Sequence, residues 1–174
     1  MLIEIKAPEV YSSIKYNLNT YPSLFMAGGI SNCSDWQVEL ANKLDNENLV
    51  IFNPRRDDFN VLDPAMELEQ IQWEHRYLRE AQAVLFWFPK ETLCPITLFE
   101  LGATLERTRV VIDNDYNGYD AYPQTIFIGT DPDYKRRRDV EIQTSLVLPG
   151  INIVDSIDGL ASQVKQWVKQ FNEG

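Results

Sequence analysis

Short apolar runs alternate with helical patterns along most of the chain. Runs of four to six apolar residues, most of them ended by Gly, Asn or Pro, are typical of buried strands. We expect such strands at 23–27, 49–52, 83–88, 125–129 and 151–154, and a further short strand at 110–112. Apolar residues spaced three or four apart predict helices after Ser34 or Asp35, and over about 64–81, 96–106, 139–148 and 156–171. The polar segment 113–124 is expected to be a loop.

This alternation predicts one α/β domain over residues 1–174, because parallel strands need helical crossovers between them. We expect a five-stranded parallel sheet with helices on both faces. Its strands should bury Phe25, Phe52, Leu85, Phe127 and Ile153. In such open sheets the ligand binds beyond the carboxyl ends of the strands. The segments to search are therefore 28–32, 53–58 and 89–100.

The net charge of the chain limits which kinds of partner it can bind. Sixteen basic and 26 acidic residues give a net charge of −10, which favours neither nucleic acid nor an anionic membrane. The sequence has no apolar stretch of membrane-spanning length and no signal-peptide pattern at its start, so we expect a cytoplasmic protein. Cys33 and Cys94 are expected to be reduced thiols, and the single histidine, His75, is too few for a His-rich zinc site.

Two of the searched segments carry unusual residues. Glu100 lies in the otherwise apolar stretch 96–105, where a carboxylate is partly desolvated and can serve as a nucleophile or a proton carrier. The alternative is a solvent-facing glutamate on an amphipathic helix. Gly28 and Gly29 follow the first predicted strand, so a ligand can approach the backbone closely there, although any tight strand–helix turn uses the same residues.

Charged residues mark two further candidates. Arg55 and Arg56 directly follow a predicted strand, where they can bind a phosphate or carboxylate, or simply pair with the acidic residues beside them. Glu74 and His75 lie in a helical stretch with Trp73 and can supply a second acid/base group. A surface histidine and a core tryptophan are the competing interpretation.

Taken together, these motifs resemble the nucleoside 2-deoxyribosyltransferase superfamily, and most closely its deoxyribosyltransferase-like branch. The resemblance spans roughly 24–148. It is carried by the strand ending in Ala27-Gly28-Gly29, by the strand followed by Asn53-Pro54-Arg55, and above all by Phe86-Trp87-Phe88-Pro89 leading to Phe99-Glu100-Leu101-Gly102.

The resemblance implies a flavodoxin-like fold and cleavage of the N-glycosidic bond of a nucleoside or nucleotide. Glu100 would attack the anomeric carbon, and a free nucleobase or water would then take the sugar. Glu74, or failing it His75, would protonate or hold the base. The implied substrate-binding residues are Phe25, Gly28, Gly29, Ser31, Asn53, Arg55, Arg56, Trp87, Cys94 and Thr97. No metal or other cofactor is implied, and the expected assembly is a homo-oligomer whose neighbouring subunit helps close the site.

Two positions depart from the transferase pattern. Phe25 stands where the family has tyrosine, and Cys94 stands where it has the aspartate that binds sugar hydroxyls, a role that Thr92 or Thr97 can take over. These departures leave three interpretations open. The first is a nucleoside glycosyltransferase, and the second is a hydrolase of nucleoside 5′-monophosphates, favoured by Arg55, Arg56 and Ser31. The third is a non-catalytic nucleotide-binding module.

Overall fold

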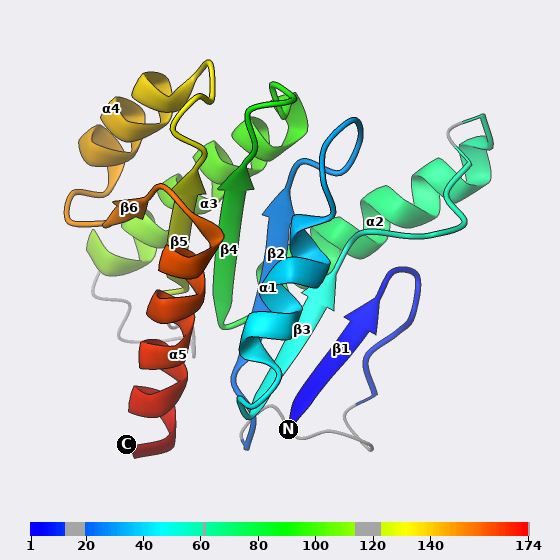
Figure 1. Cartoon of the computed structure of the whole chain (residues 1–174), viewed down its shortest axis with the longest axis horizontal. Coiled ribbons are helices and arrows are strands. Elements are labelled where there is room, and N and C mark those ends of the chain that lie inside the picture. The colour runs from blue at the N-terminus through cyan, green and yellow to red at the C-terminus, as the bar shows by residue number, and fades with distance from the viewer. Residues whose placement is uncertain (13–19, 61, 114–122, 174) are drawn as a thin grey trace.

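The computed structural model describes residues 1–12, 20–60, 62–113 and 123–173. Within these ranges the chain forms one sheet and five helices (Figure 1). The strands are β1 (Leu2–Lys6), β2 (Ser23–Gly28), β3 (Leu49–Asn53), β4 (Ala83–Phe88), β5 (Thr125–Thr130) and β6 (Ile153–Val154). The helices are α1 (Trp36–Leu44), α2 (Pro64–Glu80), α3 (Pro95–Asp113), α4 (Arg137–Val147) and α5 (Ile157–Glu173). All neighbouring strands are parallel, which confirms the predicted α/β fold.

Helices cover both faces of the sheet, as predicted. In Figure 1, α1 and α5 lie in front of the strands, and α2 and α3 lie behind them. The two faces have separate apolar cores, one with Trp36, Leu40 and Val164 and the other with Trp73 and Leu101. Successive residues of a strand point to opposite faces, so each buried strand supplies both cores.

The order of the strands places a crevice near the middle of the sheet. The order is β1-β3-β2-β4-β5-β6, so the chain steps from β2 to one side and then returns to add β4 on the other. The order of connection therefore reverses between β2 and β4. Ligands of open parallel sheets bind at the carboxyl ends of the strands at such a reversal.

Two expectations about strands are wrong. The sheet has six strands rather than five, because Leu2–Lys6 pairs with β3 at the edge of the sheet. The only sign of this strand in the sequence is the alternation of Ile3 and Ile5 with polar residues, and that alternation is very short. The triplet 110–112 belongs to α3 and not to a strand. The helix continues through it because Leu105 and Thr108 keep its inner face buried.

The predicted core is largely confirmed. Phe25, Phe52, Leu85 and Phe127 are all buried, whereas Ile153 is only half-buried because it lies on a two-residue strand at the sheet edge. The predicted loop 113–124 lies mostly outside the described residues. None of the described helices is both long enough and apolar enough to cross a bilayer.

Helix starts follow simple capping chemistry. The Asp35 carboxylate accepts a hydrogen bond from the Val38 amide at the start of α1, and Asp63 does the same for two amides of α2. Pro64 occupies the first turn of α2, where no backbone hydrogen bond is lost. These local signals fix where α1 and α2 begin, and therefore which residues reach the crevice.

Close packing at the end of β2 generates the first prediction. A Cβ on Gly28 would clash with the ring of Trp36 and lie 2.7 Å from the carbonyl oxygen of Trp87. We expect Gly28→Ala to lower the free energy of unfolding by about 1–3 kcal/mol. The matched control is Gly102→Ala in α3, where a Cβ meets open space and should add roughly 0.5–1 kcal/mol. Urea denaturation measures both, and a Gly28→Ala protein as stable as the wild type would contradict the packing described.

Candidate functional site

A cavity of about 400 Å³ opens at the carboxyl ends of β2 and β4, where the strand order reverses. Its wall comes from four parts of the chain: the end of β2 with the following turn, the segment after β3, the middle of α2, and the start of α3. The lining residues are Phe25, Ala27, Gly28, Gly29, Ile30, Ser31, Pro54, Arg56, Phe59, Glu67, Gln70, Ile71, Glu74, Thr92, Cys94, Pro95, Ile96, Thr97 and Glu100. The cavity therefore collects residues from all three segments that the sequence singled out.

The turn after β2 forms a tightly packed part of the wall. The Trp36 indole donates a hydrogen bond of 2.8 Å to the Gly29 carbonyl oxygen, which fixes the turn against α1. A Cβ on Gly29 would lie 2.8–3.0 Å from atoms of Pro89, Thr92 and Cys94. Only glycine lets the turn approach the loop before α3 this closely, so the turn and the start of α3 meet at the cavity.

Glu100 faces the cavity from α3 with little compensation for its burial. Its carboxylate forms no hydrogen bond or ion pair within the described ranges. Burial, and then the negative charge of Glu74, raise the pKa of Glu100 to about 8. This carboxyl group is therefore mainly protonated at neutral pH.

Glu74 faces the same cavity from α2 and is held in place. The Gln70 side-chain amide donates hydrogen bonds of 2.7 Å to Glu74 and to the Pro54 carbonyl oxygen. Burial raises the pKa of Glu74, and the hydrogen bond from Gln70 partly opposes that rise. Burial thus favours the protonated form of both carboxyl groups, and the charge of Glu74 adds to this effect at Glu100.

Gln70 is a site residue that the sequence did not single out. Its spacing of four residues from Glu74 places both side chains on one face of α2, which was the available signal. The Gln70 side-chain oxygen is buried, and no partner for it occurs in the part of the chain described. Gln70 lines the cavity, so an unpartnered acceptor lies in its wall.

The two adjacent arginines have different surroundings. Arg55 turns away from the cavity and contacts the Gln37 side-chain oxygen at 3.0 Å and the Asp35 carboxylate at 3.3 Å. Arg56 lines the cavity, but its side chain is only 4% exposed and lies 3.0 and 2.7 Å from Asp58 and Glu69. Both positive charges are therefore already compensated by carboxylates of the chain.

Three more predicted residues lie outside the cavity lining. Trp87 points into the core on the other face of the sheet, because residues of β4 alternate between faces. The Asn53 side chain is buried and binds the carboxylate of Glu4 at 2.7 Å. His75 is exposed on α2, one position past Glu74 and so turned away from the cavity wall.

The remaining predicted residues line the cavity. Gly28 and Gly29 form the turn, Ser31 lies at its exposed end, and Phe25 is buried against Trp73 with ring centroids 6.1 Å apart. Thr97 is buried in the first turn of α3.

Cys94 is held in an unusual conformation at the start of α3. Its φ of +46° is uncommon outside glycine, asparagine and aspartate, and the strain is typical of ligand sites. Burial raises the pKa of its thiol to about 12, so it stays protonated at neutral pH. Burial also raises the pKa of Cys33, and both cysteines are free, as predicted.

Comparison with known proteins agrees with the resemblance seen in the sequence. Residues 21–115, more than half of the chain, match the sequence model of a family described as nucleoside 2-deoxyribosyltransferase like. The matched range contains Glu74, Glu100 and the turn after β2. A search of curated proteins found no match to the chain.

The raised pKa of Glu100 generates a prediction about stability. The folded protein keeps a proton on Glu100 up to about pH 8, whereas the unfolded chain loses it near pH 4.5. The folded state therefore binds more protons between these values, and the contribution of Glu100 to stability falls as the pH rises. We expect Glu100→Gln to match the wild type near pH 5 and to melt higher at pH 8.5, by on the order of 5 °C.

Thermal unfolding at both pH values measures this difference. The matched control is Glu106→Gln on the same helix, because the pKa of Glu106 is lowered by its hydrogen bond to Arg109. That substitution should give no gain at either pH. A Glu100→Gln protein with the same melting temperature as the wild type at pH 8.5 would show that the ionised Glu100 carboxylate does not destabilise the folded protein.

Proposed function

Since the chain belongs to the nucleoside 2-deoxyribosyltransferase-like family, we propose that it cleaves the N-glycosidic bond of a nucleoside through a glycosyl ester on Glu100 and passes the sugar to another base. The observation that carries the proposal is the pair of carboxyl groups, Glu100 and Glu74, facing one cavity from two helices. A retaining cleavage of a glycosidic bond needs such a pair, one group as the nucleophile and the other as the acid.

The chemistry balances with one shared proton. The Glu100 carboxylate forms a bond to C1′ while the C1′–N bond breaks. The electron pair of the broken bond passes to the base nitrogen. The proton on Glu74 moves to that nitrogen, so the base leaves neutral. In the second step a nitrogen of the incoming base attacks C1′, Glu100 leaves as a carboxylate, and the proton lost by that base returns to Glu74.

The attack requires the proton to lie on Glu74 and not on Glu100. Burial and the charge of Glu74 favour the protonated form of Glu100, so a bound nucleoside has to reverse this preference and leave the proton on Glu74. A base nitrogen that accepts a hydrogen bond from Glu74 stabilises its protonated form and favours the reversal. Gln70, which lines the cavity and donates a hydrogen bond to Glu74, fixes the position of the Glu74 carboxyl group for this purpose.

The arginines support a nucleoside more than a nucleotide as the substrate. A 5′-phosphate needs cations that are free to bind it, whereas Arg55 and Arg56 already contact Asp35, Asp58 and Glu69. The nucleotide hydrolase is therefore the less supported alternative. A purely binding module is also less supported, because it gains nothing from burying Glu100 without a partner, and such burial is destabilising.

The apolar rim of the cavity supports a homo-oligomer. Ile71 of α2 and Ile96 of α3 line the cavity yet are 55% and 65% exposed. Leu68 and Phe99, one turn away on the same helices, are 56% and 76% exposed. We propose that a second copy of the chain covers this surface and closes the cavity, because a contiguous apolar patch beside a site typically marks an interface.

Base exchange tests the proposed reaction. With deoxyinosine and free adenine we expect deoxyadenosine and hypoxanthine as products, and Glu100→Ala should lower kcat by about three or more orders of magnitude. Chromatography of the bases and nucleosides measures both. Hypoxanthine released equally fast without adenine would identify a hydrolase. A near-normal rate in Glu100→Ala, or no reaction under any of these conditions, would end the proposal.

A change of leaving group tests the role of Glu74. We expect Glu74→Gln to slow the reaction of deoxyinosine by roughly 10²–10⁴-fold, because the base then leaves without a proton. An N7-methylated purine deoxynucleoside carries a positive charge on its base and should react at a nearly unchanged rate. The control is His75→Gln, which alters the exposed neighbour of Glu74. Its rate with deoxyinosine should stay within about twofold of the wild type. A slow His75→Gln protein together with a near-normal Glu74→Gln protein would instead identify His75 as the acid.

Substitution of the rim tests the assembly. We expect Phe99→Glu to reduce the oligomer to a monomer and to lower activity, since it places a charge in the covered surface. Leu146→Glu is the matched control, because Leu146 is 73% exposed but lies on α4, away from the cavity. Light scattering after size exclusion gives the masses. A monomeric wild type, or a Phe99→Glu protein of unchanged mass, would rule out this interface.

A further inference from the structure

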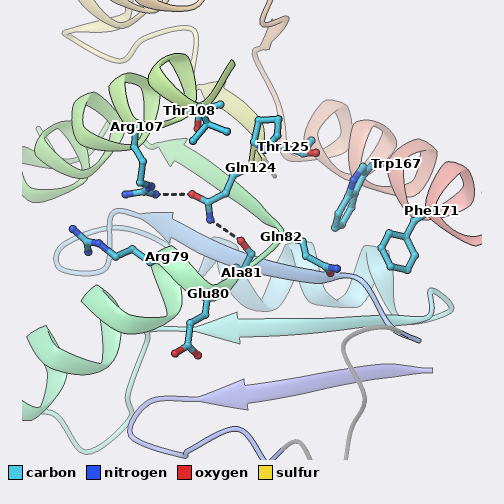
Figure 2. Close-up of a pocket in the computed structure, with 12 residues that line it drawn as sticks. Arg79, Glu80, Ala81, Gln82, Arg107, Thr108, Gln124, Thr125, Trp167 and Phe171 are labelled. Atoms are coloured by element: carbon cyan, nitrogen blue, oxygen red, sulfur yellow. Dashed lines mark hydrogen bonds between the residues drawn. The ribbon is translucent and has the colours of Figure 1, made fainter. Parts of the chain in front are cut away.

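A second cavity, of about 610 Å³, lies at the opposite ends of the strands from the cavity of Glu74 and Glu100, which we call the catalytic cavity. Figure 2 shows the residues that line the second cavity. It opens at the amino ends of β4 and β5, between the last residues of α2, the second half of α3 and the end of α5. Its volume is within the usual range of small-molecule sites. We call it the basal groove, and it shares no lining residue with the catalytic cavity.

Two arginines face one end of the basal groove, and neither pairs with a carboxylate of the described residues; Glu80, which also lines the groove, pairs with Arg76. Figure 2 shows the side chains of Arg79 and Arg107 on the same side of the groove. Burial, and then the charge of Arg79, lower the pKa of Arg107, so the two cations are close enough to repel each other. Neither forms a salt bridge within the described ranges, whereas Arg55, Arg56, Arg76, Arg109, Arg136 and Arg137 all do.

Neighbouring polar groups hold this end of the groove in a defined shape. The Arg107 guanidinium donates a hydrogen bond to the Gln124 side-chain oxygen, and the amide of Gln124 donates in turn to the Ala81 carbonyl oxygen at 2.6 Å. Thr108, which also lines the groove, is only 3% exposed, and its hydroxyl has no partner in the described part of the chain. Its hydroxyl therefore keeps an unused donor in the wall of the groove.

The other end of the basal groove is aromatic. Trp167 and Phe171 of α5 line it, with ring centroids 6.3 Å apart, and both side chains are partly exposed. Figure 2 shows them across the groove from the arginines, with the start of β4 between. Aromatic faces of this kind bind planar rings by stacking.

From these features we propose that the basal groove binds an organic phosphate monoester that carries a planar ring. The phosphate lies against Arg79 and Arg107, and the ring lies against Trp167 and Phe171. A phosphate dianion neutralises two adjacent guanidinium groups and accepts their paired hydrogen bonds. Its oxygens can also accept the hydrogen bond that the Thr108 hydroxyl is free to donate. This site is separate from the catalytic cavity and does not depend on the proposed function.

Titration with dAMP, followed by NMR, tests the proposal. The probe signal is the indole N–H resonance of Trp167, assigned by its loss in Trp167→Phe. We expect dAMP to shift this resonance with saturable binding, and deoxyadenosine and inorganic phosphate to bind at least about tenfold more weakly, since each supplies half of the contacts. Arg79→Gln and Arg107→Gln should each weaken dAMP binding about 10- to 100-fold.

The matched control is Arg138→Gln, because Arg138 also lacks a salt bridge among the described residues but lies on α4, away from the groove. Its affinity for dAMP should equal that of the wild type. Arg79 is exposed, so Arg79→Gln keeps the test valid even if Arg107→Gln fails to fold. The proposal is overturned if dAMP leaves the Trp167 resonance in place, or if the Arg79 and Arg138 variants bind it equally well.

Discussion

The partial burial of two carboxyl groups beside one cavity is the constraint on which the rest of this structure depends. Among the residues that the structure describes, Glu100 has neither a cation nor a hydrogen-bond donor to offset its burial, and Glu74 has only the amide of Gln70. Such a pair can persist only if α2 and α3 are held firmly on the same face of the sheet. The aromatic contacts of Trp73 and Tyr77 with Phe52 provide that hold for α2.

Most of the fold could be predicted from the sequence, because the central strands are continuous apolar runs, and such runs are typical of buried strands. The errors fall where the pattern is shortest. The edge strand β1 has only Ile3 and Ile5 as its signal, and the triplet 110–112 is equally apolar in a strand or a helix. Its true state follows from the buried positions earlier in α3, which a local pattern does not reveal.

The candidate site was predicted less completely, because it depends on where side chains point. Glu100 stands out as a charge in an apolar stretch, and the structure brings it to the cavity. Arg55 and Arg56 look equivalent in the sequence, yet one turns away and the other meets two carboxylates. Trp87 points to the face of the sheet away from the cavity, and the alternation of side chains along β4 could have predicted this. Gln70 looks ordinary until its contacts with Glu74 and Pro54 are known.

Direct observation of the sugar on Glu100 tests the central claim. A 2′-deoxy-2′-fluoro nucleoside destabilises the electron-poor transition states of both steps, so a glycosyl ester should accumulate once formed. The account predicts a fluorosugar adduct on the peptide that contains Glu100, located on that residue by tandem mass spectrometry and absent from Glu100→Gln. An adduct on a different residue, or ordinary base exchange in Glu100→Gln, would contradict it.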